Sequence, residues 1–346
     1  MSQKRDVIVV GAGVIGLAAA WRIAQRGASV AVIDRGEPGA GATRVSAGML
    51  APVTEAEFED EPLIEARLTA AATWPRFAAE LAEAGGVDCG YRRNGCLFVA
   101  LDADELADVR RHHDFRRKLG LGAEWLLPSA CRELEPALST AAAGGSFTPD
   151  DGEVDPRALT LALLAALERA HVSIVRDEVT SLKEAFARGH TVVAATGAWA
   201  DWLPDEARPP VRPVKGQIVR LRGPAADPVV ERTIRTPAVY VVPRASGEVV
   251  VGATVEERGF DTTVTAGAVY ELLREAYRAV PELAELELAE ASAGLRPGTP
   301  DNAPIVERST VDGLVVATGH FRNGILLAPT AAERVAELVT EQAVVA

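Results

Sequence analysis

The apolar run Val7-Ile-Val-Val10 continues directly into Gly11-Ala-Gly13-Val-Ile-Gly16, and this stretch decides the fold of the chain. A short apolar run that ends in a glycine turn and leads into an alanine-rich segment predicts a buried strand, a tight turn and a helix. The first glycine permits the turn, the second lets the backbone approach a pyrophosphate, and the third lets helix and strand pack closely. Amide groups at the start of the helix then face the diphosphate charge. The stretch therefore predicts a dinucleotide-binding βαβ unit.

The strand predicted for Ser29-Val-Ala-Val-Ile-Asp34 completes this unit. Asp34 lies at the strand end, where a carboxylate accepts hydrogen bonds from ribose hydroxyls and disfavours a 2′-phosphate. The following loop, Gly41-Ala-Thr-Arg-Val-Ser-Ala-Gly-Met-Leu50, is rich in small and hydroxyl-bearing residues. The ribityl chain of a flavin needs such a loop close by, with Thr43 and Ser46 as donors. The loop therefore favours FAD over NAD, and NADP is not expected.

Two further apolar runs end in glycine, Thr191-Val-Val-Ala-Ala-Thr-Gly197 and Gly313-Leu-Val-Val-Ala-Thr-Gly319. Continuous apolar runs bounded by glycine are typical of strands that are buried on both faces of a parallel sheet. Residues 55–140 have a helical composition, with a strand expected at Tyr91–Leu101. Residues 208–256 alternate β-branched residues with turn signals, which predicts a meander of antiparallel strands.

We therefore predict an α/β fold in which a Rossmann-like FAD-binding domain is interrupted twice by a second, α+β substrate domain with an antiparallel sheet. The FAD-binding domain is expected at residues 1–80, 145–207 and 293–346, and the substrate-binding domain at 81–144 and 208–292. The length of 346 residues allows two domains, each with a core of its own.

Composition limits the classes of function. Hydrophobic residues make up 48% of the chain and charged residues 25%, which argues against disorder, and a net charge of −13 argues against a nucleic-acid partner. The three cysteines form no Cys-x-x-Cys pair and the five histidines are scattered, so no metal site is expected. No apolar stretch is long enough for a membrane span, and the polar start Met1–Asp6 leads into a strand and not into a signal peptide. A cytoplasmic protein without a membrane partner is expected.

The stretch Ala317-Thr-Gly-His-Phe-Arg-Asn-Gly-Ile-Leu-Leu-Ala-Pro329 predicts a strand, a glycine-rich turn and a helix to about Val339. The start of that helix, aimed at the pyrimidine of a flavin, would stabilise negative charge on the reduced ring. Arg322 in the turn could reach toward a substrate carboxylate. Arg296 precedes a rigid Pro-Gly turn and suits two-pronged binding of a carboxylate, and Tyr240 could add a hydroxyl bond to the same group.

Six stretches of the sequence, given at the end of this paragraph, together show a resemblance to a known family. The chain resembles the glycine oxidases, which belong to the D-amino-acid oxidase and sarcosine oxidase superfamily of flavoproteins. The match runs from the first strand to the last helix, and its two most specific pieces lie near the C-terminus. The six stretches are GAGVIGLAAA at 11–20, GATRVSAGMLAP at 41–52, VYVVPR at 239–244, VVVGAT at 249–254, AGLRPGT at 293–299 and GHFRNGILLAP at 319–329.

The resemblance implies a two-domain fold, non-covalent FAD and a substrate held over the flavin face. Arg296 would bind the substrate carboxylate, with Tyr240 and Arg322 assisting. Ala238 and Val255 stand where some glycine oxidases carry a histidine and a methionine, and both changes widen the pocket. The motifs and the resemblance together give as cofactor-binding residues Gly11, Gly13, Val14, Ile15, Gly16, Asp34, Arg35, Ala42, Thr43, Arg44, Ser46, Ala47, Gly48, Met49, Val179, Thr196, Gly197, His320, Phe321, Arg322, Asn323, Gly324, Ile325 and Leu326.

The expected reaction is the FAD-dependent oxidative deamination of glycine, sarcosine or small D-amino acids. Hydride passes from Cα to flavin N5, the imino acid hydrolyses to a keto acid and ammonia or an amine, and O₂ is reduced to H₂O₂. The cofactor carries the difficult chemistry, so no protein base is required. Members of the family are commonly homotetramers, and several supply the imine of glycine for thiamine synthesis. Three alternatives stay open: a flavin-dependent amino-acid dehydrogenase with a quinone or carrier acceptor, an NAD-dependent dehydrogenase, and a non-catalytic flavoprotein or subunit of a larger complex.

Overall fold

The glycine turn follows a central strand of a mostly parallel sheet. In the computed structural model, which describes residues 4–58 and 61–343, this sheet has six strands in the order β15 (Ile305–Arg308), β16 (Leu314–Thr318), β9 (Gly189–Ala194), β1 (Arg5–Val10), β2 (Val30–Asp34) and β8 (Ser173–Arg176). All neighbours pair in parallel except β15 and β16, which are antiparallel. The parallel sheet expected from the glycine-bounded apolar runs is confirmed.

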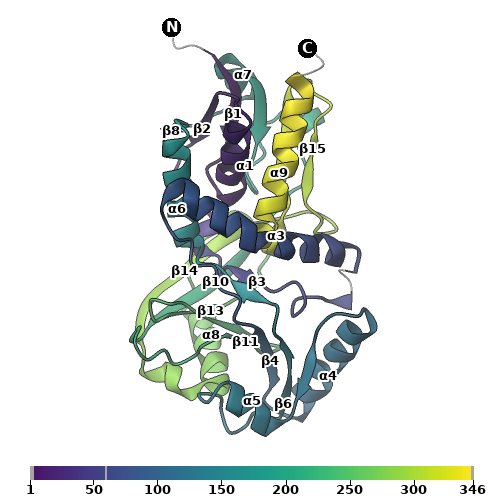
Figure 1. Cartoon of the computed structure of the whole chain (residues 1–346), viewed down its shortest axis with the longest axis vertical. Helices are drawn as coiled ribbons and strands as arrows, with labels where there is room; N and C mark the ends of the chain where they lie inside the picture. Colours follow the sequence, from purple (N-terminus) through teal and green to yellow (C-terminus); the bar gives the residue numbers. More distant parts are fainter. Residues whose placement is uncertain (1–3, 59–60, 344–346) are drawn as a thin grey trace.

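Helices cover both faces of this sheet, which forms the upper half of the molecule in Figure 1. They are α1 (Val14–Gln25), α3 (Glu61–Gly85), α6 (Pro156–Arg169), α7 (Leu182–Arg188) and α9 (Gly324–Ala343). Val7 and Val9 of β1 pack into a core with α1, α3, α6 and α9, whereas Ile8 and Val10 pack into a second core with α7. Because alternate residues of β1 are buried on opposite faces, the strand is apolar throughout. Among the residues that the structure describes, no helix is long and apolar enough to cross a membrane.

The second sheet lies in the lower half of Figure 1 and is mostly antiparallel. Its strands follow the order β14 (Glu287–Gly298), β10 (Arg212–Arg222), β13 (Glu248–Gly252), β12 (Tyr240–Pro243), β11 (Thr233–Arg235), β4 (Cys96–Ala100), β6 (Gly144–Thr148) and β5 (Glu124–Leu126). Strands β11, β12 and β13 form the expected antiparallel meander, and β10 pairs with the outer side of β13. The pairing of β4 with β11 is parallel.

Three helices accompany this sheet: α4 (Ala103–Lys118), α5 (Pro128–Leu134) and α8 (Ala266–Ala279). Cys131 of α5 and Leu272 of α8 join the core formed by β10 to β13, while Val109 of α4 packs on Phe98 of β4. Helices are thus confirmed within residues 55–140, and each sheet has a core of its own.

Three limits expected from the sequence lie elsewhere in the structure: the start of one strand and two limits between the domains. The strand expected at Tyr91–Leu101 begins only at Cys96, because Gly95 has φ +80° and turns the chain immediately before it. Strands β6 and β14 belong to the second sheet, so this sheet extends past the limits expected at residues 145 and 293. With these shifts the two-domain division stays a proposal, and its outer limits at residues 1–3 and 344–346 lie outside the described residues.

Candidate active site

A cavity of about 1010 Å³ is lined by residues of both sheets. It extends from the glycine turn and Asp34, at the carboxyl ends of β1 and β2, to Tyr240 and Arg296 of the second sheet. In open α/β sheets, ligands bind beyond the carboxyl ends of the parallel strands, and this cavity obeys that rule. Its volume is at the upper end of the range for ligand pockets, roughly 300–1,000 Å³, and suits a long dinucleotide.

Close contacts make glycine necessary at two positions of the first turn. A Cβ at Gly11, where φ is +108°, would lie 2.4 Å from the carbonyl oxygen of Ala195, and one at Gly16 would lie 1.9 Å from the carbonyl oxygen of Gly11. Helix α1 begins at Val14, and its N-cap Gly13 has no side chain to accept from the first amides, of which that of Val14 donates to the Thr43 hydroxyl. Val14 and Ile15 line the cavity at the start of this helix, so the turn fits a pyrophosphate.

Asp34 lines the cavity and also fixes the two loops around it. Its carboxylate accepts hydrogen bonds from the amides of Ala12 at 2.7 Å and Gly36 at 2.8 Å. Each carboxylate oxygen has a second lone pair, so the group can still accept from a ribose hydroxyl. The neighbouring Arg35 pairs with Glu178 at 3.4 Å and lies over the ring of Trp199, 5.2 Å from its centroid. This end of the cavity suits the adenosine half of a dinucleotide.

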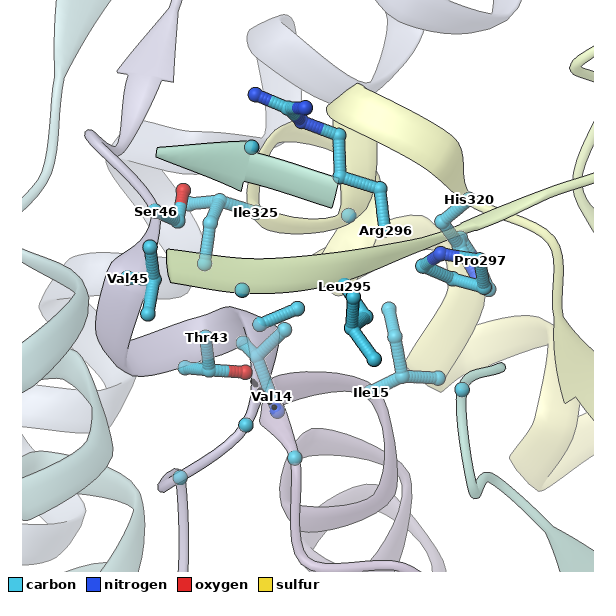
Figure 2. A pocket seen from close by; sticks show the side chains of 18 of the residues that line it. Val14, Ile15, Thr43, Val45, Ser46, Leu295, Arg296, Pro297, His320 and Ile325 are labelled. Carbon is cyan, nitrogen blue, oxygen red and sulfur yellow. Dashed lines mark hydrogen bonds between the residues drawn. The ribbon is translucent and has the colours of Figure 1, made fainter. Parts of the chain in front are cut away.

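The loop expected to contact a ribityl chain contains the short helix α2 (Ala42–Val45) and the strand β3 (Met49–Leu50), which pairs with β7 (Gly152–Glu153). The Thr43 hydroxyl accepts from the Val14 amide at 3.0 Å, as Figure 2 shows, and the Ser46 hydroxyl accepts from the Gly48 amide at 3.2 Å. Each hydroxyl keeps its own proton to donate. Both are therefore available to the hydroxyls of a ribityl chain.

The C-terminal turn brings a buried histidine to the cavity. His320 precedes the 3₁₀ helix η4 (Phe321–Asn323), is 3% exposed, and burial lowers its pKa to about 4. The ring is therefore neutral near pH 7. Within residues 4–58 and 61–343 its Nε2 atom has no hydrogen-bond partner. A buried polar atom without a partner normally binds water or a ligand, and a polar edge of a flavin fits this position.

Arg296 and Tyr240 meet at the other end of the cavity, on the second sheet. The Arg296 guanidinium donates to the carbonyls of Thr254 at 3.1 Å and Lys215 at 3.4 Å, and it lies so close to Gly216 that a Cβ there would be 2.3 Å from its Nη1. In Figure 2 it projects from β14 on the side opposite to Leu295. Burial raises the pKa of Tyr240, while the charge of Arg296 opposes this shift. The pair thus offers a fixed cation and a neutral hydroxyl, which suit a carboxylate.

A carboxylate that sequence reasoning missed connects two cavity arginines. Glu57 pairs with Arg322 at 3.0 Å and with Arg235 at 3.2 Å. Burial raises the pKa of Glu57, but the charges and hydrogen bonds of Arg322 and then Arg235 outweigh it, so the pKa is lowered overall. Arg235 of β11 lies directly opposite Tyr240 of β12 in the strand register. The hairpin formed by these two strands was the signal that could have identified Arg235.

The structure brings most of the expected residues to this cavity. Four do not line it: Gly16 packs against the turn, Arg44 is exposed, and Asn323 and Leu326 are buried elsewhere. Val255 lines the cavity although it is 70% exposed, which places it at the rim. The lining residues that sequence reasoning missed include Glu55, Trp199, Trp202, Arg235 and Thr236, and the expected ones are Gly11, Gly13, Val14, Ile15, Asp34, Arg35, Ala42, Thr43, Ser46, Ala47, Gly48, Met49, Val179, Thr196, Gly197, Ala238, Tyr240, Val255, Arg296, His320, Phe321, Arg322, Gly324 and Ile325.

A parallel sheet with a phosphate-binding turn, joined through one cavity to an arginine and a tyrosine on a second sheet, defines a dinucleotide-dependent oxidoreductase. The chain matches the family model described as "DAO: FAD dependent oxidoreductase" over residues 6–338, and it belongs to this family. FAD is therefore its cofactor, and the alternative of an NAD-dependent dehydrogenase is wrong.

Relatives confirm the resemblance to the glycine oxidases. A glycine oxidase of Geobacillus kaustophilus is 36% identical, over 98% of this chain and 94% of the relative. A crystal structure of glycine oxidase from that organism has a TM-score of 0.90 at 35% identity and covers 98% of this chain and 95% of the other. A bifunctional protein ThiO/ThiG of Trichormus variabilis is 35% identical over 98% of this chain, which spans 53% of that relative.

Proposed function

We propose that this protein catalyses the oxidative deamination of glycine, sarcosine or small D-amino acids. O₂ is reduced to H₂O₂, and a keto acid is released with ammonia or an amine. The observation that carries this proposal is the continuous cavity from the glycine turn at Gly11 to Arg296 and Tyr240. A cofactor bound at the turn and a carboxylate bound at the arginine would share one chamber. Bound FAD supplies the two-electron acceptor for such a reaction.

Arg296 would hold the substrate by its carboxylate. Its Nη1 is occupied by the carbonyls of Thr254 and Lys215, which fix the plane of the guanidinium, and its other donors can bind a carboxylate in two-pronged fashion. Tyr240 is partly buried and its pKa is raised, so its hydroxyl keeps its proton and can donate to the same carboxylate. A substrate fixed in this way keeps its Cα in one place, and such orientation contributes several kcal/mol to lowering a barrier.

The residues that surround this carboxylate site set the size of substrate. Ala238 and Val255 line the cavity, and neither fills the space that a histidine or a methionine would occupy. The pocket therefore has room for a small side chain or an N-methyl group beside glycine. Sarcosine and D-alanine are expected substrates on this ground.

The relatives support a role in thiamine synthesis. The name "Bifunctional protein ThiO/ThiG" belongs to longer relatives of which this chain spans 53%, and a relative from Rhizobium etli, 34% identical, is named "Putative thiamine biosynthesis oxidoreductase ThiO". We extend this role to the present chain as part of the proposal. A homo-oligomeric assembly, commonly a tetramer in the family, and a cytoplasmic location belong to the same proposal.

The proposal is tested with the purified protein in two assays. The visible spectrum shows whether FAD is bound, and a peroxide assay with glycine, sarcosine and pairs of D- and L-amino acids shows what is oxidised. The proposal predicts a yellow protein that forms H₂O₂ from glycine or from D-amino acids. Bleaching of the flavin without peroxide would instead show a dehydrogenase with another electron acceptor.

A further inference from the structure

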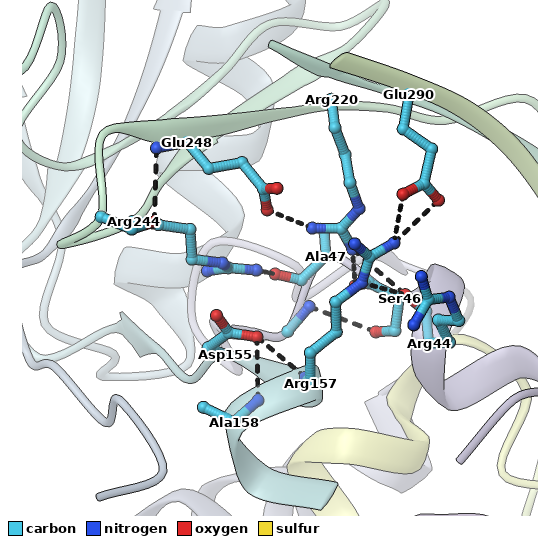
Figure 3. A network of polar contacts seen from close by, with 12 residues as sticks. Arg44, Ser46, Ala47, Asp155, Arg157, Ala158, Arg220, Arg244, Glu248 and Glu290 are labelled. Atoms are coloured by element: carbon cyan, nitrogen blue, oxygen red, sulfur yellow. Dashed lines mark hydrogen bonds and ion pairs between the residues drawn. The ribbon is translucent and has the colours of Figure 1, made fainter. Parts of the chain in front are cut away.

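Three arginines converge on the backbone of residues 44–47, which comprise the end of α2 and the start of the loop to β3, as Figure 3 shows. They are Arg157 of α6, Arg220 of β10, and Arg244, which follows β12. Their guanidinium groups point at the backbone carbonyls of Arg44, Ser46 and Ala47. We call Arg157, Arg220 and Arg244 the arginine clamp.

Arg220 makes the most contacts with the loop. Its Nη2 donates to the carbonyl of Arg44 at 3.1 Å and to that of Ser46 at 3.4 Å, and its Nη1 binds the carboxylate of Glu248. The Arg220 side chain is completely buried. A guanidinium in such a place is costly unless its charge is paired, and Glu248 provides the pairing.

The two other arginines repeat this arrangement. Arg244 donates to the carbonyl of Ala47 and faces Glu153 at 4.0 Å, and its side chain is 4% exposed. Arg157 donates to the carbonyl of Arg44 at 3.4 Å and binds Glu290 at 2.7 Å, and its side chain is 25% exposed. Each arginine thus has a carboxylate partner, so the clamp binds backbone carbonyls and is not a site for a free anion.

The clamp also determines the direction of an amide group. A trans peptide is planar, so the N–H of one residue points away from the carbonyl of the residue before it. Because Arg220 binds the carbonyl of Ser46, the N–H of Ala47 points in the opposite direction. Ala47 lines the cavity and is 5% exposed, and in the described part of the chain its amide has no acceptor. A buried N–H of this kind is rare unless a ligand satisfies it.

The next amide in the loop is satisfied by the loop itself. Arg244 binds the carbonyl of Ala47, and the N–H of Gly48 that follows donates to the Ser46 hydroxyl at 3.2 Å. The Ala47 amide is therefore the donor that the clamp leaves for another molecule. Helix α2, which precedes this loop, lies against the second sheet, where a Cβ at Gly294 would be 3.0 Å from Val45.

We propose that Arg220 and Arg244, with Arg157, are positioning residues that present the N–H of Ala47 to an acceptor atom of bound FAD. The proposal rests on FAD occupying this cavity. Strand β10 connects the clamp with the substrate arginine. Its residues Gly216, Ile218 and Arg220 alternate along the strand and therefore share one face. Gly216 lies under Arg296, Ile218 lines the cavity and Arg220 holds the loop. One strand face therefore sets the distance between the cofactor loop and the substrate arginine.

The test compares Arg220→Gln with Arg222→Gln. Arg222 is on the same strand, its side chain is 61% exposed, and it pairs with Glu287 at 3.4 Å without touching the loop. FAD affinity is measured as the flavin fluorescence released when the purified holoenzyme is diluted. We expect the FAD dissociation constant to rise about tenfold or more in Arg220→Gln, as for the loss of a charge-assisted hydrogen bond, and about twofold or less in Arg222→Gln.

The spectrum of the bound flavin distinguishes two possible roles of the clamp. The clamp either positions the N–H of Ala47 or only attaches the two sheets to each other. Loss of the Ala47 donor should shift the visible absorption of the flavin in Arg220→Gln, and Arg220→Lys should give a partial effect because lysine keeps the charge but not the fork of donors. If the unfolding temperature falls while both the spectrum and the FAD dissociation constant match those of Arg222→Gln, the clamp only joins the sheets and the proposal is wrong.

A second variant covers the case in which Arg220→Gln does not fold. Arg157→Gln removes the most exposed member of the clamp, and we expect the FAD dissociation constant to rise about threefold. A constant equal to that of Arg222→Gln would overturn the proposal. All these readouts concern FAD binding, so a wild-type protein that retains FAD but oxidises no amino acid would contradict the proposed function and leave the clamp proposal intact.

Discussion

The two ends of the cavity are built in different ways. The end proposed to receive the dinucleotide consists mainly of backbone, and Gly11, Gly13 and Asp34 line it within one βαβ unit. The end proposed to receive the substrate is lined by charged and hydroxyl side chains from distant segments, among them Arg235, Tyr240 and Arg296, and Glu57 pairs with Arg235. A backbone site depends on local sterics, whereas a site of side chains depends on how strands far apart in the sequence pair. Substitutions at the two ends should therefore fail in different ways.

The largest effect is expected at the dinucleotide end, from Gly16→Ala. The added Cβ would lie 1.9 Å from the backbone oxygen of Gly11, which has no room to move, so the turn must open. We expect a loss of stability on the order of 4 kcal/mol and a protein purified without FAD. Flavin content per chain and the midpoint of urea unfolding measure both effects. Gly122→Ala, where a Cβ would meet nothing within 4 Å, is the control, and equal behaviour of the two variants would contradict the steric argument.

At the substrate end, Arg296→Ala should leave FAD bound and damage substrate binding. Loss of the carboxylate partner is expected to raise KM for glycine about 100-fold or more, with a smaller change in the FAD dissociation constant. Steady-state kinetics and the flavin spectrum measure the two separately. A KM near that of the wild type would remove Arg296 from the site.

His320 lines the cavity and should make stability depend on pH. Its folded pKa of about 4 is below the unfolded value of 6.5, so the unfolded chain binds the proton more tightly. The contribution of the neutral ring is complete above pH 6.5 and is lost as the pH falls from 6.5 to 4, by on the order of 3 kcal/mol. Urea unfolding at several pH values measures this loss in the wild type and in His320→Gln. A pH dependence that is the same in both proteins would show that His320 is not the titrating group.

The smallest effect is expected from Glu57→Gln, which keeps the shape of the bridge between Arg235 and Arg322 but removes one negative charge. The substrate end becomes more positive, so acidic substrates should gain relative to neutral ones. We expect the ratio of kcat/KM for D-aspartate to that for D-alanine to rise about fivefold, and less at high salt. The exposed Glu65→Gln is the matched control. A ratio that does not differ between the two variants would limit Glu57 to holding the loop.

The same contrast explains what the sequence could predict. The glycine turn, the parallel strands and most of the cavity residues expected to bind the cofactor follow from local patterns, because sterics at Gly11 and the apolar runs of β1 and β9 act over a few residues. Arg44 was expected at the cavity because it stands in the right loop. The structure shows that its side chain is exposed and that its carbonyl binds Arg220.

Most residues of the substrate end required the fold to be known. Arg235 lies opposite Tyr240 because β11 pairs with β12, and this hairpin is the local signal that could have identified it. Glu57 lies in a loop without a recognisable motif, and no spacing connects it to Arg322. The arginine clamp is equally hidden, since Arg220 is 176 residues from Arg44, whose carbonyl it binds. Side-chain contacts over such separations have no signature in a single sequence.

The most direct test of the account is an anaerobic titration of the purified protein with glycine, followed by the absorption of its flavin. We predict that glycine bleaches the wild type and that Arg296→Ala, still carrying FAD, stays yellow at the same concentration. If the wild type keeps its FAD but neither glycine, sarcosine nor D-alanine bleaches it, or if Arg296→Ala bleaches equally well, the cavity does not join the cofactor to a carboxylate-bound substrate.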